Sequence, residues 1–189
     1  MFKIDIDEKI ALELVHPFRA DELFSIIDRN RELFSRWLIW VEESRSVEDT
    51  HKFIRSALQG YAEGKSIDCV VLYEGEAVGM IGMHGLQKRL YEVRRGDIGY
   101  WLDAMYHGTG IMTKAVSKMM EIGFEHYDCE KMTIRCATTN ERSCMIPRRL
   151  GFTCEGTLRK DIVVGGNVMD AHHFSLLKEE WRQMRDAKA

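Results

Sequence analysis

Two glycines, Gly108 and Gly110, stand two residues apart in the segment YHGTGIM, which joins a strand-like stretch to a helix-like one. Glycine adopts positive φ angles without strain and lets another group approach the backbone closely. Residues 111–127 repeat apolar side chains every three or four positions, which is typical of a helix buried along one face. The segment therefore predicts a strand-to-helix turn, where the first helical N–H groups and the positive end of the helix dipole are available to an anion.

The loop does not match the two common phosphate-binding fingerprints. It lacks the lysine and Ser/Thr of a P-loop, and no glycine stands three residues after Gly110, as a dinucleotide fingerprint requires. From the loop alone, phosphate binding and an ordinary tight turn remain equally open.

The other stretches predict an α/β chain (α+β, one mixed sheet) that forms a single domain over residues 1–189. Helical spacing begins at Ala20, and Ser46 with Asp49 is typical of a helix start. Alternating or β-rich runs predict strands over residues 9–16, 67–73, 77–86, 96–102, 131–137, 156–164 and 168–177. Helical spacing predicts helices over residues 20–30, 33–40, 46–64, 111–127 and 140–151.

Charge and hydropathy exclude several partners. The chain has 27 basic and 30 acidic residues, a net charge of -3 and no basic block, so we expect no nucleic-acid binding. It has no 18-residue apolar run and its N-terminal segment is charged, so we expect no membrane partner and a cytoplasmic location. The five cysteines form no C-x-x-C pair, which favours reduced and mostly buried thiols.

Several motifs occur in the order known from one family: IGYWLD, YHGTGIMTKAV, ATTNERS, LGFTCEGTLR and FSLLKEEW. The chain resembles the GNAT acetyltransferases, closest to their RimJ/RimL-like branch, most strongly from Asp97 to Trp181. The resemblance implies a mostly antiparallel sheet that is splayed at its central strands and flanked by helices. It also implies transfer of acetyl from acetyl-CoA directly to a primary amine, with no metal, and a homodimer formed by terminal strands as one option.

The resemblance also implies the cosubstrate site. Backbone amides of Tyr100, Trp101 and Leu102 would hold the thioester and pantetheine between the splayed strands, and Asn140 and Ser143 would lie beside them. The loop and the start of the helix would hold the pyrophosphate: His107, Gly108, Thr109, Gly110, Ile111, Met112 and Thr113.

Three loop residues depart from the family pattern. His107 stands where arginine or glutamine is usual, Thr109 where a basic residue is frequent, and Met112 where a small residue is common. Loss of a charged contact weakens binding by roughly 1 kcal/mol. A protonated His107 is one way to restore part of that charge.

The chemistry requires an acid for the departing thiolate and a base for the amine. The resemblance implies Ser143 as the acid, with Tyr100 as another acid or a group that orients the amine. Asn140 and Ser143 are also compatible with a role limited to helix capping. Two carboxylates remain open as the base, Glu155 and Asp97; we favour Glu155 because Asp97 is shorter and can pair with Arg94 or Arg95.

The ionisation of the acceptor constrains its identity. An α-amine with a pKa near 7.7 is about one-sixth neutral at pH 7, whereas a lysine near 10.4 is neutral about once in 2,500. This difference corresponds to roughly 3.7 kcal/mol and favours α-amines or other amines of low pKa. A peptide N-terminus and a small-molecule amine both remain open.

The resemblance places three residues near the acceptor: Trp37, Trp40 and His84. Each also has a purely structural interpretation, because the tryptophans can pack helices on the sheet and a solitary histidine is often a core residue. Glu42, Glu43, Glu48 and Asp49 favour a cationic acceptor or simply form a solvated face.

Two features suggest alternatives. Pro147 interrupts the helix after Asn140 and predicts a kinked or late-starting helix that moves Ser143. Cys144 is a candidate acetyl-carrying nucleophile, although no histidine stands near it in the sequence. The departures also leave open a catalytically weak module that binds acyl-CoA as a sensor or interaction partner.

Overall fold

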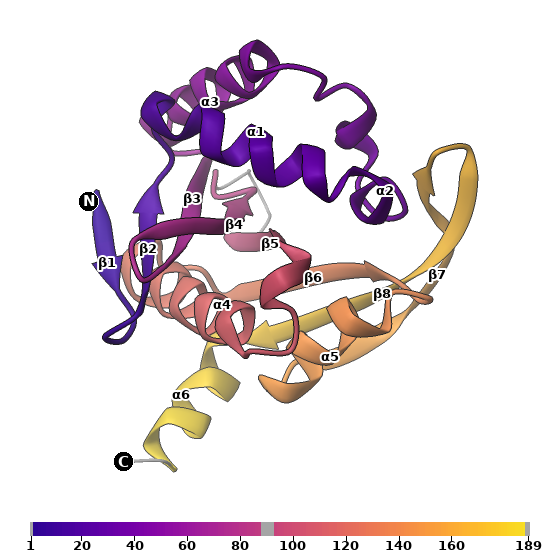
Figure 1. Cartoon of the computed structure of the whole chain (residues 1–189). Coiled ribbons are helices and arrows are strands. Elements are labelled where there is room, and N and C mark those ends of the chain that lie inside the picture. Colours follow the sequence, from indigo (N-terminus) through magenta and orange to yellow (C-terminus); the bar gives the residue numbers. More distant parts are fainter. Residues whose placement is uncertain (1, 88–92, 188–189) are drawn as a thin grey trace.

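The computed structural model describes residues 2–87 and 93–187 and contains one eight-stranded sheet, with the strand order β1-β2-β3-β4-β5-β6-β8-β7. Figure 1 shows helices on both sides of this sheet. The strands are β1 (Lys3–Asp5), β2 (Ile10–Leu14), β3 (Ser66–Tyr73), β4 (Glu76–His84), β5 (Arg95–Leu102), β6 (Lys131–Ala137), β7 (Thr153–Val164) and β8 (Asn167–Leu177).

The six α-helices are α1 (Ala20–Arg29), α2 (Arg31–Phe34), α3 (Val47–Ala62), α4 (Ile111–Glu121), α5 (Glu141–Arg149) and α6 (Lys178–Asp186). Short 3-10 segments cover Pro17–Arg19, Ile39–Glu42 and Ala104–Tyr106, and a π-helical turn covers Ile122–His126. Among the helices of the described ranges, none combines the length and the apolar character needed to cross a membrane.

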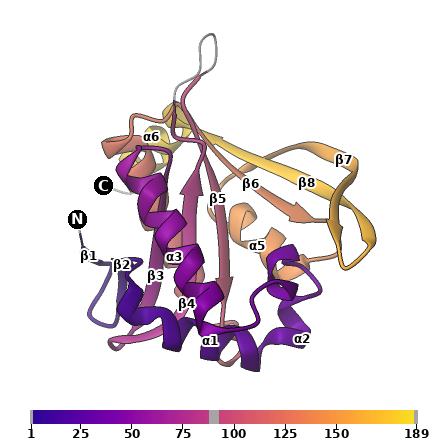
Figure 2. The same cartoon turned by 90° about the horizontal axis from the view of Figure 1, so that it is seen from above.

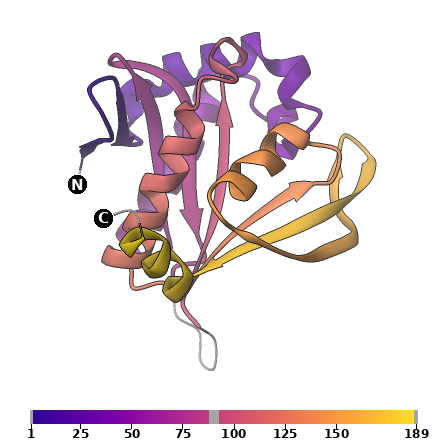
Figure 3. The same cartoon turned by 90° about the horizontal axis from the view of Figure 1, so that it is seen from below.

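The sheet divides the apolar residues into two cores because successive side chains of a strand point to opposite faces. In β3, Val70 and Leu72 pack against α1 and α3 on one side, which we call the upper face, whereas Cys69 and Val71 pack with α4 on the lower face. Figure 2 shows α1 and α3 across β3 and β4, and Figure 3 shows α4 and α5 on the opposite side.

The central strands separate after a short parallel contact. In the described ranges, β5 and β6 form the one parallel pair, and their register covers only Arg95↔Lys131, Gly96↔Met132 and Asp97↔Thr133. Beyond these residues β5 continues to Leu102 and β6 to Ala137, but the two strands no longer pair with each other and diverge (Figure 2). The predicted α/β fold with a mostly antiparallel, splayed sheet is confirmed.

Several local predictions are confirmed as well. The Ser46 hydroxyl accepts a hydrogen bond from the Asp49 N–H and caps α3. Tyr73 pairs with Glu76 across a two-residue turn in which Glu74 and Gly75 have positive φ angles, the geometry of a tight hairpin. Strand β6 covers the predicted residues 131–137.

Other elements differ from prediction. Strand β1 and helix α6 were not predicted, and the predicted helix over residues 33–40 is instead the single turn α2 followed by a separate 3-10 turn. The predicted long helix ends as α-helix at Glu121 and continues as a π-turn. Helix α5 starts directly after Asn140 and contains Pro147, so of the two predicted alternatives, a kinked or a late-starting helix, the late start is wrong.

Candidate active site

The glycine-rich loop adopts the turn that its sequence predicts. Gly108 and Gly110 have φ angles of 80° and 83°, a region that disfavours side chains. Gly110 is the N-cap of α4 and makes no side-chain cap, and the Lys114 N–H donates to the Gly110 carbonyl. The N–H groups of residues 111–113 precede that bond, so they have no partner within the helix. The turn therefore presents donors at the positive end of the α4 dipole.

A buried carboxylate fixes the start of this loop. Asp103 is 1% exposed; Arg29 donates to its carboxylate from Nε at 3.0 Å, and Asn30 donates to it at 3.0 Å. Asn30 also accepts a hydrogen bond from the Ala104 N–H at 3.1 Å. Burial alone would raise the pKa of Asp103, but the hydrogen bonds from Arg29 and Asn30 outweigh it and lower the pKa. The end of β5 is thus tied to helix α1.

His107 connects the loop to α5. Its Nε2 lies 2.9 Å from the Leu102 carbonyl oxygen and its Nδ1 lies 3.0 Å from the Arg142 guanidinium. Since a carbonyl only accepts and a guanidinium only donates, both contacts are satisfied by a neutral imidazole with its proton on Nε2. Arg142 thus brings a full positive charge to the loop.

A cavity of about 380 Å³, which we call the splay cavity, lies between this loop, α2, α5 and the end of β5. Arg142, Asn140 and Ser143 line it from α5 and its N-cap. The residues that line it from the other elements include Leu33, Phe34, Trp37, Leu38, Tyr100, Trp101, Leu102, Tyr106, His107, Gly108, Gly110, Met112 and Thr113. It therefore brings most of the predicted cosubstrate residues together. Trp37, predicted to lie near the acceptor, lines this cavity and not the second one described below.

Tyr100 and Ser143 meet across the divergence of β5 and β6. The Tyr100 hydroxyl donates to the Ser143 carbonyl at 3.0 Å, and the Ser143 hydroxyl donates to Tyr100 at 3.3 Å. Burial raises the pKa of Tyr100, so the phenol stays protonated. The Asn140 side chain accepts from the Ser143 N–H at 3.3 Å and so caps α5, as the capping interpretation predicts.

A second cavity, about 610 Å³ in volume, lies on the upper face between β4, β5, α1 and α3; we call it the upper cavity. Leu38, Tyr100 and Trp101 line both cavities, so the two meet at β5. The other residues that line it are Leu23, Ile27, Trp40, Glu43, Ser44, Asp49, Thr50, Lys52, Phe53, Asp68, Met80, Gly82, His84 and Gly99. Trp40 and His84 are thus brought together here, and the Trp40 ring packs 6.2 Å from Trp101.

The floor of the upper cavity carries a contact between a histidine and a carboxylate. His84 Nε2 lies 3.3 Å from Asp68 Oδ1, and the Asp68 side chain is 8% exposed. The hydrogen bond that His84 donates to Asp68 outweighs burial and raises the pKa of His84, and the negative charge of Asp97 adds to the effect. Asp97 is the Cα partner of His84 on β5.

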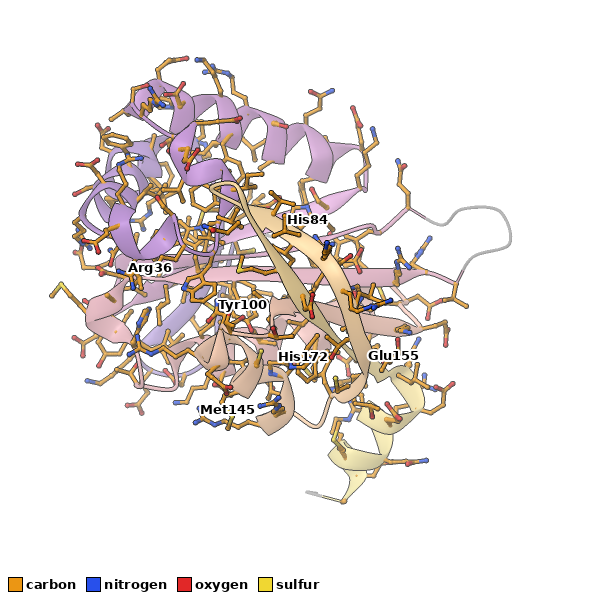
Figure 4. All side chains as sticks on the ribbon, turned by 90° about the vertical axis from the view of Figure 1, so that its right-hand side faces the viewer. Arg36, His84, Tyr100, Met145, Glu155 and His172 are labelled. Carbon is orange, nitrogen blue, oxygen red and sulfur yellow. The ribbon has the colours of Figure 1, made fainter. Side chains whose placement is uncertain are left out.

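The two predicted bases lie outside both sets of lining residues. The Glu155 carboxylate accepts from Lys131 at 2.7 Å and from Ser175 at 2.9 Å, and these contacts lower the pKa of Glu155. Asp97 accepts from the Thr133 hydroxyl and lies 3.8 Å from Arg95, the pairing considered from the sequence. Figure 4 shows Glu155 on the β7–β8 side of the molecule and His84 on the side of α1 and α3.

Cys144 also lies outside both cavities. It is 1% exposed, its thiol donates to the Ala137 carbonyl at 3.5 Å, and burial raises its pKa. A buried, protonated thiol is a poor nucleophile. This geometry disfavours an acetyl-cysteine intermediate.

Arg142, Asp68 and Thr50 are among the lining residues of the two cavities that were not predicted from the sequence. Asp68 carried a usable signal, because a charged residue inside the apolar run SIDCVVLY must find a partner when that strand is buried. Thr50 is 3% exposed, and among the described residues its hydroxyl is the buried side-chain polar atom that has no hydrogen-bond partner. Nothing in the helical spacing of α3 marks that property.

Comparisons with known proteins find acetyltransferases that are similar to this chain. Residues 11–153 match the family described as acetyltransferase (GNAT) domain. The putative ribosomal N-acetyltransferase YdaF of Bacillus subtilis (strain 168) is 34% identical over 96% of this chain and 98% of its own. The ribosomal-protein-serine acetyltransferase of Escherichia coli (strain K12) is 25% identical over 83% of this chain and 86% of its own.

A solved acetyltransferase structure is also similar to this chain. The microcin C7 self-immunity acetyltransferase MccE, in complex with acetyl-CoA and AMP, matches with a TM-score of 0.85 and 25% identity, over 92% of this chain and 95% of that one.

Proposed function

Because the chain belongs to the GNAT acetyltransferase family and is an N-acetyltransferase, we propose that acetyl-CoA binds in the splay cavity and that the acceptor amine enters from the upper cavity. The two ribosomal-protein acetyltransferases among the relatives confirm the resemblance to the RimJ/RimL-like branch. The observation that carries the proposal is that the two cavities meet at Tyr100 and Trp101, next to the divergence of β5 and β6. A donor and an acceptor held in separate cavities can react directly only where those cavities join.

The loop before α4 supplies the anion contacts in this proposal. The amides of residues 111–113 and the α4 dipole face the pyrophosphate, and Arg142 adds a full positive charge. Backbone amides of Tyr100, Trp101 and Leu102 bind the pantetheine and thioester, because this stretch of β5 has no strand partner on its β6 side.

The reaction then needs few protein groups. The nitrogen lone pair of the neutral amine attacks the thioester carbon and the carbon–sulfur bond breaks. The thiolate takes a proton from Ser143, and the proton that the nitrogen loses restores the Ser143 hydroxyl. Tyr100 orients Ser143 through the hydrogen bonds that join them. Because a thiol has an ordinary pKa of about 8.5, the thiolate is a moderate leaving group and the acid contributes only part of the acceleration.

We propose an α-amine at a peptide N-terminus as the acceptor. Its low pKa makes the neutral form accessible at pH 7, and the upper cavity combines apolar walls with the acidic Glu43, Asp49 and Asp68. The names of the relatives support the same class, since two of them refer to ribosomal proteins. Trp40 and Trp101 form an aromatic wall suited to the first side chain of the peptide.

The test is a calorimetric titration with acetyl-CoA, followed in the same sample by thiol release with seryl and alanyl tripeptides and with spermidine. We expect binding and amine-dependent release, faster with the tripeptides. Release with spermidine alone would move the acceptor to polyamines, and binding without release by any amine would contradict the proposal.

A further inference from the structure

The upper cavity contains a polar arrangement of which the proposal above uses only Asp68, as an acidic lining residue. His84, Asp68 and Thr50 all line it, from β4, β3 and α3. The Thr50 hydroxyl is buried and, within the described ranges, has no hydrogen-bond partner. A buried hydroxyl without a partner costs free energy unless something else binds it, so the cavity is suited to a polar ligand.

The absence of a side chain at Gly82 makes the His84–Asp68 contact possible. Gly82 lies between these residues in the register, opposite Asp68 on β3 and opposite Gly99 on β5. A Cβ atom at Gly82 would lie 2.4 Å from Asp68 Oδ1 and 2.7 Å from His84 Nε2. The imidazole and the carboxylate therefore meet directly above the Gly82 backbone, in the space that any other residue would fill.

The same register brings the pair close to the proposed reaction centre. Neighbouring strands lie about 4.8 Å apart, so the imidazole above Gly82 is one strand away from Gly99. A Cβ atom at Gly99 would meet no atom within 4 Å, which leaves open space over β5 immediately before Tyr100. An amine in this space would lie between His84 and the thioester position. In contrast, Glu155 and Asp97 line neither cavity.

From this geometry we infer that His84 is the base that takes the proton from the acceptor amine and that Asp68 is the positioning residue that holds its imidazole. With the Nε2–H donated to Asp68, the imidazole accepts at Nδ1. The ammonium loses one proton to His84 and the neutral nitrogen forms the new bond to the acetyl carbon. As the carbon–sulfur bond breaks, Ser143 gives its proton to the thiolate, and the second proton lost from the attacking nitrogen restores the Ser143 hydroxyl.

Proton balance requires a route to solvent, and His84 provides one. Its side chain is 53% exposed, so the imidazolium can pass its proton to water before the next turnover. The charged groups around it are Asp68 on β3, Asp97 on β5 and the more distant Glu43, Asp49 and Lys52 on the helical wall. Asp68 and Asp97 both favour the protonated imidazole, which strengthens it as a base.

This inference rests on the proposed function, and the test separates the two. The pH dependence of kcat is measured from pH 5.5 to 9.5 at saturating acetyl-CoA and seryl tripeptide, for wild type, His84→Gln, Asp68→Asn and the exposed-histidine control His126→Gln. Acetyl-CoA affinity is measured for each variant as a check on folding and on the splay cavity.

We expect His84→Gln to lower kcat roughly 100-fold at pH 6.5, because general bases contribute about 10²–10⁴. The loss should shrink to a few-fold at pH 9.5, where the α-amine is already neutral. Asp68→Asn should lower the maximum of the kcat–pH profile and shift its acidic limb to lower pH, since the carboxylate that raises the pKa of His84 is gone. Imidazole added to His84→Ala should restore part of the rate, and His126→Gln should match wild type.

Parallel pH profiles for wild type and His84→Gln, or a loss confined to KM, would overturn the role of His84 as a base and leave the transferase intact. If wild type releases no thiol with any peptide, the proposed function itself is wrong, and this inference with it. If the acidic limb of the kcat–pH profile stays in place in Asp68→Asn while the acetyl-CoA affinity is normal, Asp68 does not have the positioning role.

Discussion

The Tyr100 hydroxyl donates a hydrogen bond to the Ser143 carbonyl oxygen at 3.0 Å. In a regular helix this carbonyl would accept from the N–H four residues later, but that residue is Pro147, which has no N–H. The proline therefore frees an acceptor inside α5, and a side chain from β5 uses it. The contact joins the two walls of the splay cavity.

Pro147→Ala should weaken this link. The new N–H would compete with Tyr100 for the Ser143 carbonyl, and a hydrogen bond of this kind contributes about 0.5–1.5 kcal/mol. We expect kcat to fall roughly 3- to 10-fold while acetyl-CoA affinity changes less than twofold. Turnover measured beside Tyr100→Phe and the double variant provides the control: the losses should not add, and additive losses or an unchanged rate would show that the proline is only structural.

Ser143→Ala should slow the departure of the thiolate. We expect kcat to fall about 10- to 100-fold at pH 7, and less above pH 9, where a thiol with a pKa of about 8.5 leaves without a proton. Steady-state kinetics across this pH range measure the effect. Cys144→Ala is the matched control at the next position and should keep full activity, and a loss that is constant with pH would point to capping of α5 as the role of Ser143.

The local elements were predictable because their signals lie within a few residues. The Ser46–Asp49 cap, the Glu74–Gly75 hairpin turn and the amphipathic α4 each depend on neighbours in sequence. Strand β1 was not predictable in this way, because three residues become a strand only through pairing with β2. Helix α6 depends on the packing of Trp181 against Phe124, whose rings lie 5.1 Å apart.

In the candidate site, too, the predictable residues are those that a local sequence motif marks. Motif residues such as Asn140, Ser143 and the glycine loop were predictable, and the structure gathers them at one cavity. The contacts between His84 and Asp68 and between Arg142 and His107 were not, because each joins two elements whose register the sequence does not specify. Glu155 illustrates the converse: its motif matched, but Lys131 binds its carboxylate away from both cavities.

Arg142→Gln should weaken acetyl-CoA binding. The guanidinium beside His107 is a full charge at the edge of the phosphate-binding loop, so its loss should raise the acetyl-CoA Kd about 5- to 20-fold, or about 1–2 kcal/mol. Calorimetry at low and high salt measures the acetyl-CoA Kd of wild type and variant. The difference between the two Kd values should narrow at high salt because exposed charges are screened. His107→Ala should have a smaller effect, and the reverse order would contradict the assignment of the charge to Arg142.

Asp103→Asn should destabilise the loop through its attachment to α1. Arg29 would lose its anionic partner, and we expect the free energy of unfolding at pH 7 to fall by about 2 kcal/mol. Since the folded state lowers the pKa of Asp103, its contribution is present above the unfolded value of about 3.9 and is lost as the pH falls through the folded value. Urea unfolding should therefore show a smaller difference in free energy of unfolding between wild type and Asp103→Asn at pH 3 than at pH 7. An equal difference at the two pH values would contradict this.

Gly99→Ala should separate acceptor binding from stability. A Cβ atom at this position meets no atom within 4 Å, so the fold tolerates it, but the new methyl group projects into the upper cavity. We expect KM for a peptide amine to rise at least 5-fold, with the free energy of unfolding and the acetyl-CoA Kd nearly unchanged. Gly82→Ala is the informative partner, because its Cβ would collide with Asp68 and His84 and should lower kcat as well. If Gly99→Ala raised the acetyl-CoA Kd and left the peptide KM unchanged, the assignment of the two cavities to the two substrates would be reversed.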